Sequence, residues 1–122
     1  MVEDSEDDAL LLVRQLKKGG YRPTYDQVGT AEVMSKAIEK QTWDVILCDN
    51  SMPSFNALDA LGIYKEKRLD LPFIIVTGAI AYKNATEIMR AGAHDYILKN
   101  DLAALIPAID RAFSMLKNWQ EQ

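Results

Sequence analysis

The chain has 122 residues and a formal net charge of −4, with 48% hydrophobic and 26% charged residues, the composition of one ordinary globular domain. The net negative charge argues against direct binding to nucleic acid, because phosphate-rich partners need clustered Lys and Arg. No apolar run approaches the roughly 18 residues of a membrane span, so no membrane association is expected. The single cysteine, Cys48, fits a reducing compartment, and we therefore expect a cytoplasmic protein without disulfides.

The first residues form an acidic cluster, with carboxylates at five of the positions 3–8. Ser5 followed by Asp8 fits a capping box, which places the later acids of the cluster in the favourable first turn of a helix. The apolar positions that follow at helical spacing are Ala9, Leu12, Val13 and Leu16. Gly19 then ends this first predicted helix.

Candidate strands occur at regular intervals along the chain. Residues 44–49 and 71–78 are compact apolar runs, typical of strands buried on both faces, and residues 95–99 form a third short strand. Residues 23–28 are a further candidate, and their proline indicates the start of a strand or an edge strand. A first strand would have to lie within residues 1–2, so we expect the native strand to begin further upstream.

Helical patterns separate these strands. Thr30 is a candidate cap for one helix, and residues 57–67 form the next. A helix over residues 84–91 precedes Gly92, which is placed for a left-handed cap. The last helix carries a strong apolar stripe interrupted by Pro107, where we expect a kink or a separate first turn.

This alternation predicts an α/β fold with a doubly wound, five-stranded parallel sheet and helices on both faces. We expect a single domain over residues 1–122. The polar residues 117–122 hint at the start of a connector to a further domain.

Polar side chains follow the predicted strands at the edge where open α/β sheets bind ligands. They are Glu3, Asp4, Asp49, Thr77 and Lys99. Each pair of acids about 4 Å apart costs on the order of 4 kcal/mol at an effective dielectric near 20, so either some acids are protonated or a cation lies among them. Oxygen ligands of this kind suit Mg²⁺. A metal, a Lys and a hydroxyl around one carboxylate are the parts needed for phosphoryl transfer, with Asp49 as the nucleophile.

Four motifs carry a resemblance to a known family. Glu3-Asp4, DNSMP (49–53), VTG (76–78) and DYILK (95–99), in this order and spacing, closely resemble the receiver domain of two-component response regulators. The resemblance covers essentially the whole chain. It implies the flavodoxin-like strand order 2-1-3-4-5.

The resemblance also implies roles for individual residues. Asp49 would accept a phosphoryl group from a phosphohistidine on a histidine kinase or a histidine phosphotransfer protein. Asp4 and Asp49 would ligate Mg²⁺ together with the backbone carbonyl of Ser51, and Glu3 would act directly or through water. The reaction would be self-catalysed phosphoryl transfer and autodephosphorylation, and the chain would otherwise not be an enzyme.

Three further residues would form the switch. Lys99 would pair with the phosphoryl group, and Thr77 would swing to hydrogen-bond it. Tyr96 would change rotamer and remodel the face made by the fourth and fifth helices and the fifth strand. The resemblance is also compatible with a homodimer.

Two positions depart from the family pattern. Ala57 stands where the family usually has Gly, so a positive φ there would be strained. Asn100 follows Lys99 where the family usually has Pro, often after a cis bond. Because a cis bond before a residue other than Pro costs about 3 kcal/mol, we expect this bond to be trans.

Two other functions would also place an aspartate after a buried strand of this fold. Aspartate-nucleophile phosphatases generally need a second acid two residues after the nucleophile, and Ser51 occupies that position. A pseudo-receiver, with the fold but without phosphorylation, is disfavoured because all the site residues are present. Cys48 and His94 have no second ligand nearby in the sequence and are expected to be a buried small residue and a surface or loop histidine.

Overall fold

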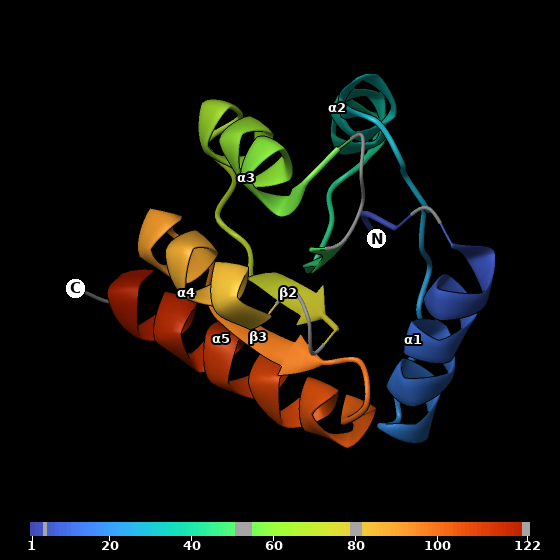
Figure 1. The fold of residues 1–122 in the computed structure, drawn as a ribbon. Coiled ribbons are helices and arrows are strands. Elements are labelled where there is room, and N and C mark those ends of the chain that lie inside the picture. The colour runs from blue at the N-terminus through green and yellow to red at the C-terminus, as the bar shows by residue number, and fades with distance from the viewer. Residues whose placement is uncertain (4, 51–54, 79–81, 121–122) are drawn as a thin grey trace.

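The computed structural model describes residues 1–3, 5–50, 55–78 and 82–120. Its elements are α1 (Glu6–Lys18), α2 (Ala31–Lys40), β1 (Ile46–Asp49), α3 (Ala57–Glu66), β2 (Phe73–Thr77), α4 (Tyr82–Ala91), β3 (Asp95–Leu98), the 3-10 turn η2 (Leu102–Ala104) and α5 (Leu105–Gln120). From β1 onward, strands and helices alternate as predicted (Figure 1).

The strands β1, β2 and β3 form a parallel sheet in that order. The register pairs Asp49 of β1 with Val76, and Thr77 of β2 with Leu98 of β3. Because the strands are parallel, their last residues lie at one edge of the sheet. Lys99, which follows β3 directly, lies at the same edge.

The described part of the chain has three strands, not the five that the sequence predicts. Val2 makes single parallel bridges to Val28 on one side and to Cys48 on the other. Of the predicted strand over residues 23–28, only Val28 forms a bridge, although the Met1 ammonium also donates to the Asp26 carbonyl over 2.8 Å.

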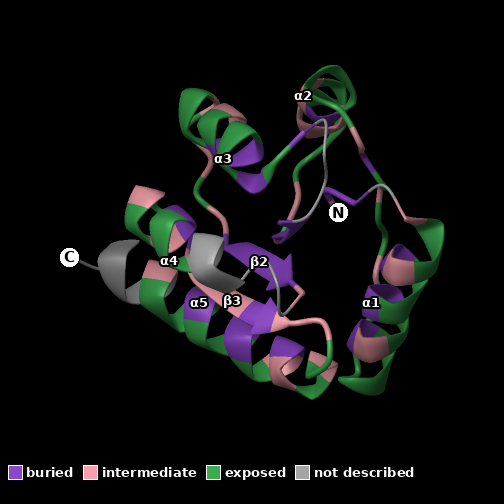
Figure 2. Ribbon diagram, viewed as in Figure 1, coloured by how far each residue is buried: buried purple, intermediate pink, exposed green. Residues whose placement is uncertain are grey.

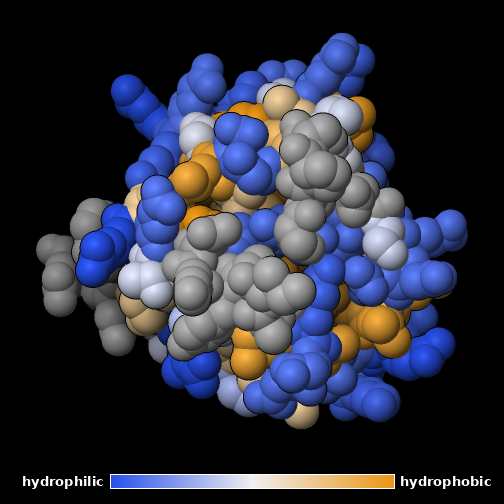
Figure 3. All heavy atoms as spheres, in the orientation of Figure 1, coloured by the Kyte–Doolittle hydropathy of each residue, from blue (hydrophilic) through white to orange (hydrophobic). Residues whose placement is uncertain are grey.

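Helices cover both faces of the sheet, as predicted, because successive strand side chains point to opposite faces. One face packs against α2, α3 and α4 through the strand residues Ile46, Cys48, Phe73 and Ile75. The other packs against α1 and α5 through Leu47, Ile74, Val76 and Ile97. Figure 2 shows that the central strand and the inward sides of the helices are buried. In the view of Figure 3, hydrophilic residues cover most of the surface and hydrophobic residues show as separate groups.

Side-chain caps fix the starts of the first two helices. The Asp8 N–H donates to Ser5 Oγ over 3.3 Å, and the Val33 N–H donates to Thr30 Oγ1 over 3.2 Å. These two predicted caps are confirmed. The other half of the predicted capping box differs, because the Ser5 N–H donates to Glu3 Oε1 over 3.0 Å and not to Asp8.

The departures from the family pattern leave the backbone unstrained. None of the peptide bonds described is cis, so the bond before Asn100 is trans as predicted. Ala57 begins α3, and the only positive φ outside glycine in the described residues is at Arg68. Pro107 is the third residue of α5, behind the separate turn η2, where its missing N–H removes no helical hydrogen bond.

His94 is more than the surface or loop histidine that we expected. It lies half-buried between α4 and β3, and its Nδ1 accepts a hydrogen bond of 2.9 Å from the N–H of Phe73, the first residue of β2. Its ring meets that of Tyr64 edge to face, with 6.2 Å between the centroids. Burial lowers the pKa of His94, although the charge of Asp70 acts to raise it. The fold therefore favours the neutral imidazole.

We expect acid to weaken the fold through His94. A histidine whose pKa is lowered on folding binds its proton more readily in the unfolded chain, so stability is present above about pH 6.5 and is lost as the pH falls through the folded pKa. The loss should reach about 1 kcal/mol, the scale of one hydrogen bond. Urea unfolding of the parent and His94→Asn between pH 7.5 and 5 measures it. The parent should lose more stability than the variant, and parallel profiles would contradict this role.

Candidate functional site

Backbone hydrogen bonds bring four of the predicted site residues to the carboxyl edge of the sheet. The Lys99 N–H donates to the Thr77 carbonyl over 2.8 Å, which ties the residue after β3 to the end of β2. The Asp49 N–H donates to the Val2 carbonyl over 2.8 Å, which places Glu3 beside the end of β1. Segments far apart in the sequence thus meet at one site.

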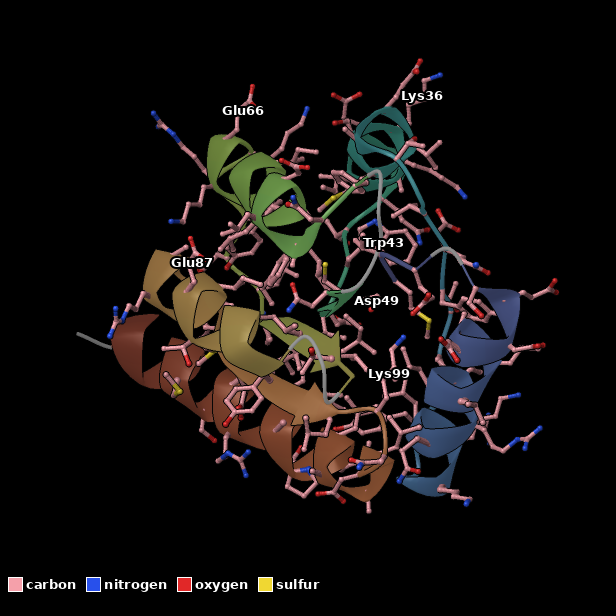
Figure 4. All side chains as sticks on the ribbon, viewed as in Figure 1. Lys36, Trp43, Asp49, Glu66, Glu87 and Lys99 are labelled. Atoms are coloured by element: carbon pink, nitrogen blue, oxygen red, sulfur yellow. The ribbon has the colours of Figure 1, made fainter. Side chains whose placement is uncertain are left out.

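The Lys99 ammonium lies among three carboxylates. Its Nζ is 3.0 Å from Asp8 Oδ2, 3.3 Å from Asp49 Oδ2 and 3.8 Å from Glu3 Oε2. Figure 4 shows Lys99 reaching from the end of β3 toward Asp49, in the space beside α1. Burial acts to lower the pKa of Lys99, but the hydrogen bond to Asp8 and the charges of Asp49 and Glu3 raise it overall. Lys99 is therefore a firmly protonated cation.

Two of these carboxylates are buried side by side. The side chains of Glu3 and Asp49 are only 2% and 3% exposed. Glu3 Oε1 accepts from the Ser5 N–H, whereas Glu3 Oε2 is buried and has no hydrogen-bond partner within the described structure. Burial and the charge of Asp49 raise the pKa of Glu3 to about 7, against the opposing effects of the Ser5 N–H and Lys99. The site thus holds more negative charge than one ammonium satisfies.

Asp8 is the site residue that the sequence analysis missed. It was interpreted only as an acid of the first helical turn, yet its carboxylate is the nearest ion-pair partner of the Lys99 ammonium in the described structure. No sequence signal marks this contact, because an acid at this position is fully explained by the first turn of a helix. The amino end of α1 begins at the same edge of the sheet as the site.

Thr77 and Tyr96 lie near the site without forming part of its ion cluster. Thr77 is fully buried, and its Oγ1 donates to the carbonyl of Gly78 over 3.1 Å. Tyr96 pairs in register with Ile75 and is half-buried, with its side chain on the face covered by α2, α3 and α4. The remaining predicted ligands, Asp4 and Ser51, lie outside the described residues.

The carboxylate oxygens of the described site are suitable ligands for a hard cation such as Mg²⁺. No group of three or more His, Cys, Asp or Glu among the described residues is arranged to hold a metal ion by itself. However, Mg²⁺ is typically held by one or two carboxylates, with water and phosphate oxygens completing its shell. Glu3 and Asp49 supply two buried carboxylates, and Glu3 Oε2 accepts no hydrogen bond in the described structure, although the Lys99 ammonium lies 3.8 Å away.

A hollow at the other end of the sheet lies apart from this site. It has a volume of about 470 Å³ and is lined by residues that include Met1, Tyr21, Asp26, Trp43 and Phe113. None of the predicted site residues lines it.

The described helices include none that is long and apolar enough to cross a membrane.

Fold and site together define a class of protein, namely parallel α/β domains that carry an acidic site with one lysine at the carboxyl edge of the sheet. The chain belongs to the response regulator receiver domain family, whose model matches residues 1–110. The resemblance drawn from the four sequence motifs is thereby confirmed.

The curated relatives are longer regulators. The chain is 33% identical to the regulatory protein LuxO of Vibrio cholerae over 95 residues, which is 75% of this chain and 21% of LuxO. It is 32% identical to the DNA-binding transcriptional regulator NtrC of Escherichia coli over 123 residues, which is 100% of this chain and 25% of NtrC. The chain therefore spans a quarter or less of these relatives.

Solved structures share the fold. Full-length FixJ from B. japonicum superposes with a TM-score of 0.83 at 22% identity, over 98% of this chain and 58% of FixJ. A response regulator receiver domain protein from Clostridium thermocellum superposes with a TM-score of 0.79 at 22% identity, over 96% of this chain and 94% of its own. Both support the α/β receiver fold.

Proposed function

We propose that the chain is a phosphoacceptor receiver domain, in which Asp49 takes a phosphoryl group from a phosphohistidine on a histidine kinase or a histidine phosphotransfer protein. The observation that carries the proposal is the buried Asp49 carboxylate, whose Oδ2 lies 3.3 Å from the Lys99 ammonium at the carboxyl edge of the sheet. An Asp49 oxygen attacks phosphorus as the bond from phosphorus to the imidazole nitrogen breaks. The bonding electron pair stays on that nitrogen.

Lys99 and a bound metal ion would each neutralise part of the negative charge at Asp49. Lys99 stabilises the negative charge of the phosphoryl oxygens, because a cation in a partly desolvated site interacts with developing charge more strongly than one in bulk water. Glu3 and Asp49, with Asp4 and the backbone carbonyl of Ser51, would hold Mg²⁺, which supplies the second positive charge when bound. Catalysis in such a site consists mainly of positioning and charge neutralisation.

The proposed output is a change of surface. Thr77 turns its hydroxyl from the Gly78 carbonyl toward the phosphoryl group, and Tyr96 follows with a change of rotamer. Thr77 lies on β2, which contacts α4, and Tyr96 lies on β3, which contacts both α4 and α5. The face made by α4, β3 and α5 is therefore the one that changes. We further propose the five-strand order 2-1-3-4-5. In this count the segment at Val2 is the first strand, the segment at Val28 is the second, and β1, β2 and β3 are the third to fifth. The bridges of Val2 to Val28 and Cys48 support this order.

Phosphorylation with a small phosphodonor tests the proposal. After acetyl phosphate treatment, intact-mass spectrometry should detect one phosphoryl adduct on the parent in the presence of Mg²⁺ and little adduct in EDTA. Asp49→Asn should lose the adduct. Asp44→Asn, which removes the same charge from an exposed position ahead of β1, should keep it. An adduct of parental size on Asp49→Asn would contradict the proposal, and sustained phosphate release from small phosphoesters would favour a phosphatase.

A further inference from the structure

Among the described contacts of the Lys99 ammonium, the contact with Asp8 is the shortest. The distance from Lys99 Nζ to Asp8 Oδ2 is 3.0 Å, and this pair is also a hydrogen bond. The Asp8 side chain is 39% exposed, whereas those of Glu3 and Asp49 are almost fully buried. Asp8 is therefore the most exposed of these three carboxylates, and water can solvate its charge when it loses Lys99.

The start of α1 leaves the Asp8 carboxylate available for this contact. In a complete capping box, the acid three residues after the cap would accept from the N–H of the cap residue. Here the Ser5 N–H donates to Glu3 Oε1, and Asp8 contributes only its own N–H to Ser5 Oγ. The Asp8 side chain thus has no described role in the cap and is directed to Lys99.

Resting on the function proposed above, we propose that Asp8 is a positioning residue that holds Lys99 on the α1 side of the unphosphorylated site and competes with the phosphoryl group for it. An ammonium has three donors and no acceptor, so its contacts follow the strongest nearby negative charge. A phosphoryl group brings nearly two negative charges to Asp49. Lys99 then turns from Asp8 toward the phosphoryl oxygens, and the first turn of α1 loses its tie to the end of β3.

This competition slows phosphoryl transfer in the parent. Before Lys99 can serve the incoming group, its pair with Asp8 must loosen, and the charge of Asp8 also repels an anionic donor. The pair is partly exposed, so its effect is modest. Removing it should raise the rate of phosphorylation about two- to fivefold, the change that corresponds to one exposed ion pair.

The chain offers a matched control at the neighbouring residue. Asp7 lies in the same first turn of α1, is exposed and has the same charge. Asp7→Asn and Asp8→Asn therefore remove the same interaction with the helix dipole. Of these two aspartates, Asp8 alone has a described contact with Lys99. A difference between the two variants reports on that contact and not on the net charge of the chain.

The first experiment measures phosphorylation of the full chain by acetyl phosphate and Mg²⁺ in the parent, Asp7→Asn and Asp8→Asn. We expect Asp8→Asn to be labelled about two- to fivefold faster than Asp7→Asn, and 1 M NaCl to reduce this difference because salt screens exposed pairs. Equal rates, or a slower rate for Asp8→Asn, would overturn the role assigned to Asp8.

A second measurement does not depend on phosphorylation. ¹³C relaxation of the Lys99 Cε in the metal-free, unphosphorylated chain reports how firmly the side chain is held. We expect lower order in Asp8→Asn than in the parent, and unchanged order in Asp7→Asn. Unchanged order in Asp8→Asn would also overturn the proposal. If none of the chains is labelled but the order falls in Asp8→Asn alone, the proposed function fails and the tie between Asp8 and Lys99 stands.

Discussion

Replacing Lys99 with Met should lower the rate of phosphorylation by about 100- to 1,000-fold, the usual effect of removing one preorganised group that stabilises a developing anion. The Lys99 Nζ is 3.3 Å from the Asp49 oxygen and remains protonated because its surroundings raise its pKa. Methionine keeps much of the side chain's length but carries no charge. The rate is measured by intact-mass spectrometry after acetyl phosphate and Mg²⁺ are added.

Lys17→Met provides the control for the Lys99 variant. Lys17 is exposed in the last turn of α1, so its loss changes the net charge of the chain without touching the site. This control should react within about twofold of the parent, as expected for the loss of one screened surface charge. Circular dichroism establishes that both variants are folded. A folded Lys99→Met chain that reacts at the parental rate would remove Lys99 from the mechanism.

Replacing Glu3 with Gln should stabilise the metal-free chain at pH 8 by about 1–3 kcal/mol, because the change removes a buried charge whose Oε2 accepts no hydrogen bond in the described structure. The pKa of Glu3 is raised on folding to about 7, so the folded chain binds this proton more tightly than the unfolded chain. Stability then falls as the pH rises from about 4.5 to 7, by the linkage of protons to folding. The advantage of Glu3→Gln should shrink to almost nothing near pH 5.

Urea unfolding in EDTA at pH 5, 6.5 and 8 measures this advantage. The titration of His94 is common to both chains and cancels in the difference. Glu6→Gln, at an exposed position of the same acidic cluster, is the control and should change stability by less than about 0.5 kcal/mol. Equal stability of the parent and Glu3→Gln at pH 8 would show that burying the Glu3 charge does not destabilise the fold. Added Mg²⁺ should stabilise the parent more than Glu3→Gln.

The core of the site could be predicted from sequence because it depends on topology. Asp49 and Lys99 each follow a short apolar strand, and parallel strands bring their carboxyl ends to the same edge. Knowing which segments are strands is therefore enough to place Asp49 and Lys99 together. The caps at Ser5 and Thr30 were equally predictable, since a cap depends on residues only three positions apart.

Contacts that depend on side-chain direction or on distant partners could not be predicted in this way. Asp8 has an obvious local interpretation at the start of a helix, and nothing local reveals that its carboxylate turns to a lysine 91 residues away. His94 caps the N–H of Phe73, 21 residues earlier, for the same reason. Of the predicted strand over residues 23–28, the structure has only the bridge at Val28, because a strand depends on backbone pairing with a distant segment that local composition does not reveal.

Reduction with borohydride tests the central claim, that Asp49 carries the phosphoryl group, most directly. An acyl phosphate is reduced to an alcohol, so a phosphorylated aspartate becomes homoserine, and peptide sequencing by tandem mass spectrometry then locates it. The account predicts homoserine at residue 49 in the chain treated with acetyl phosphate and Mg²⁺, and none in the untreated chain. Homoserine at Asp8 or another aspartate, with residue 49 unchanged, would contradict it.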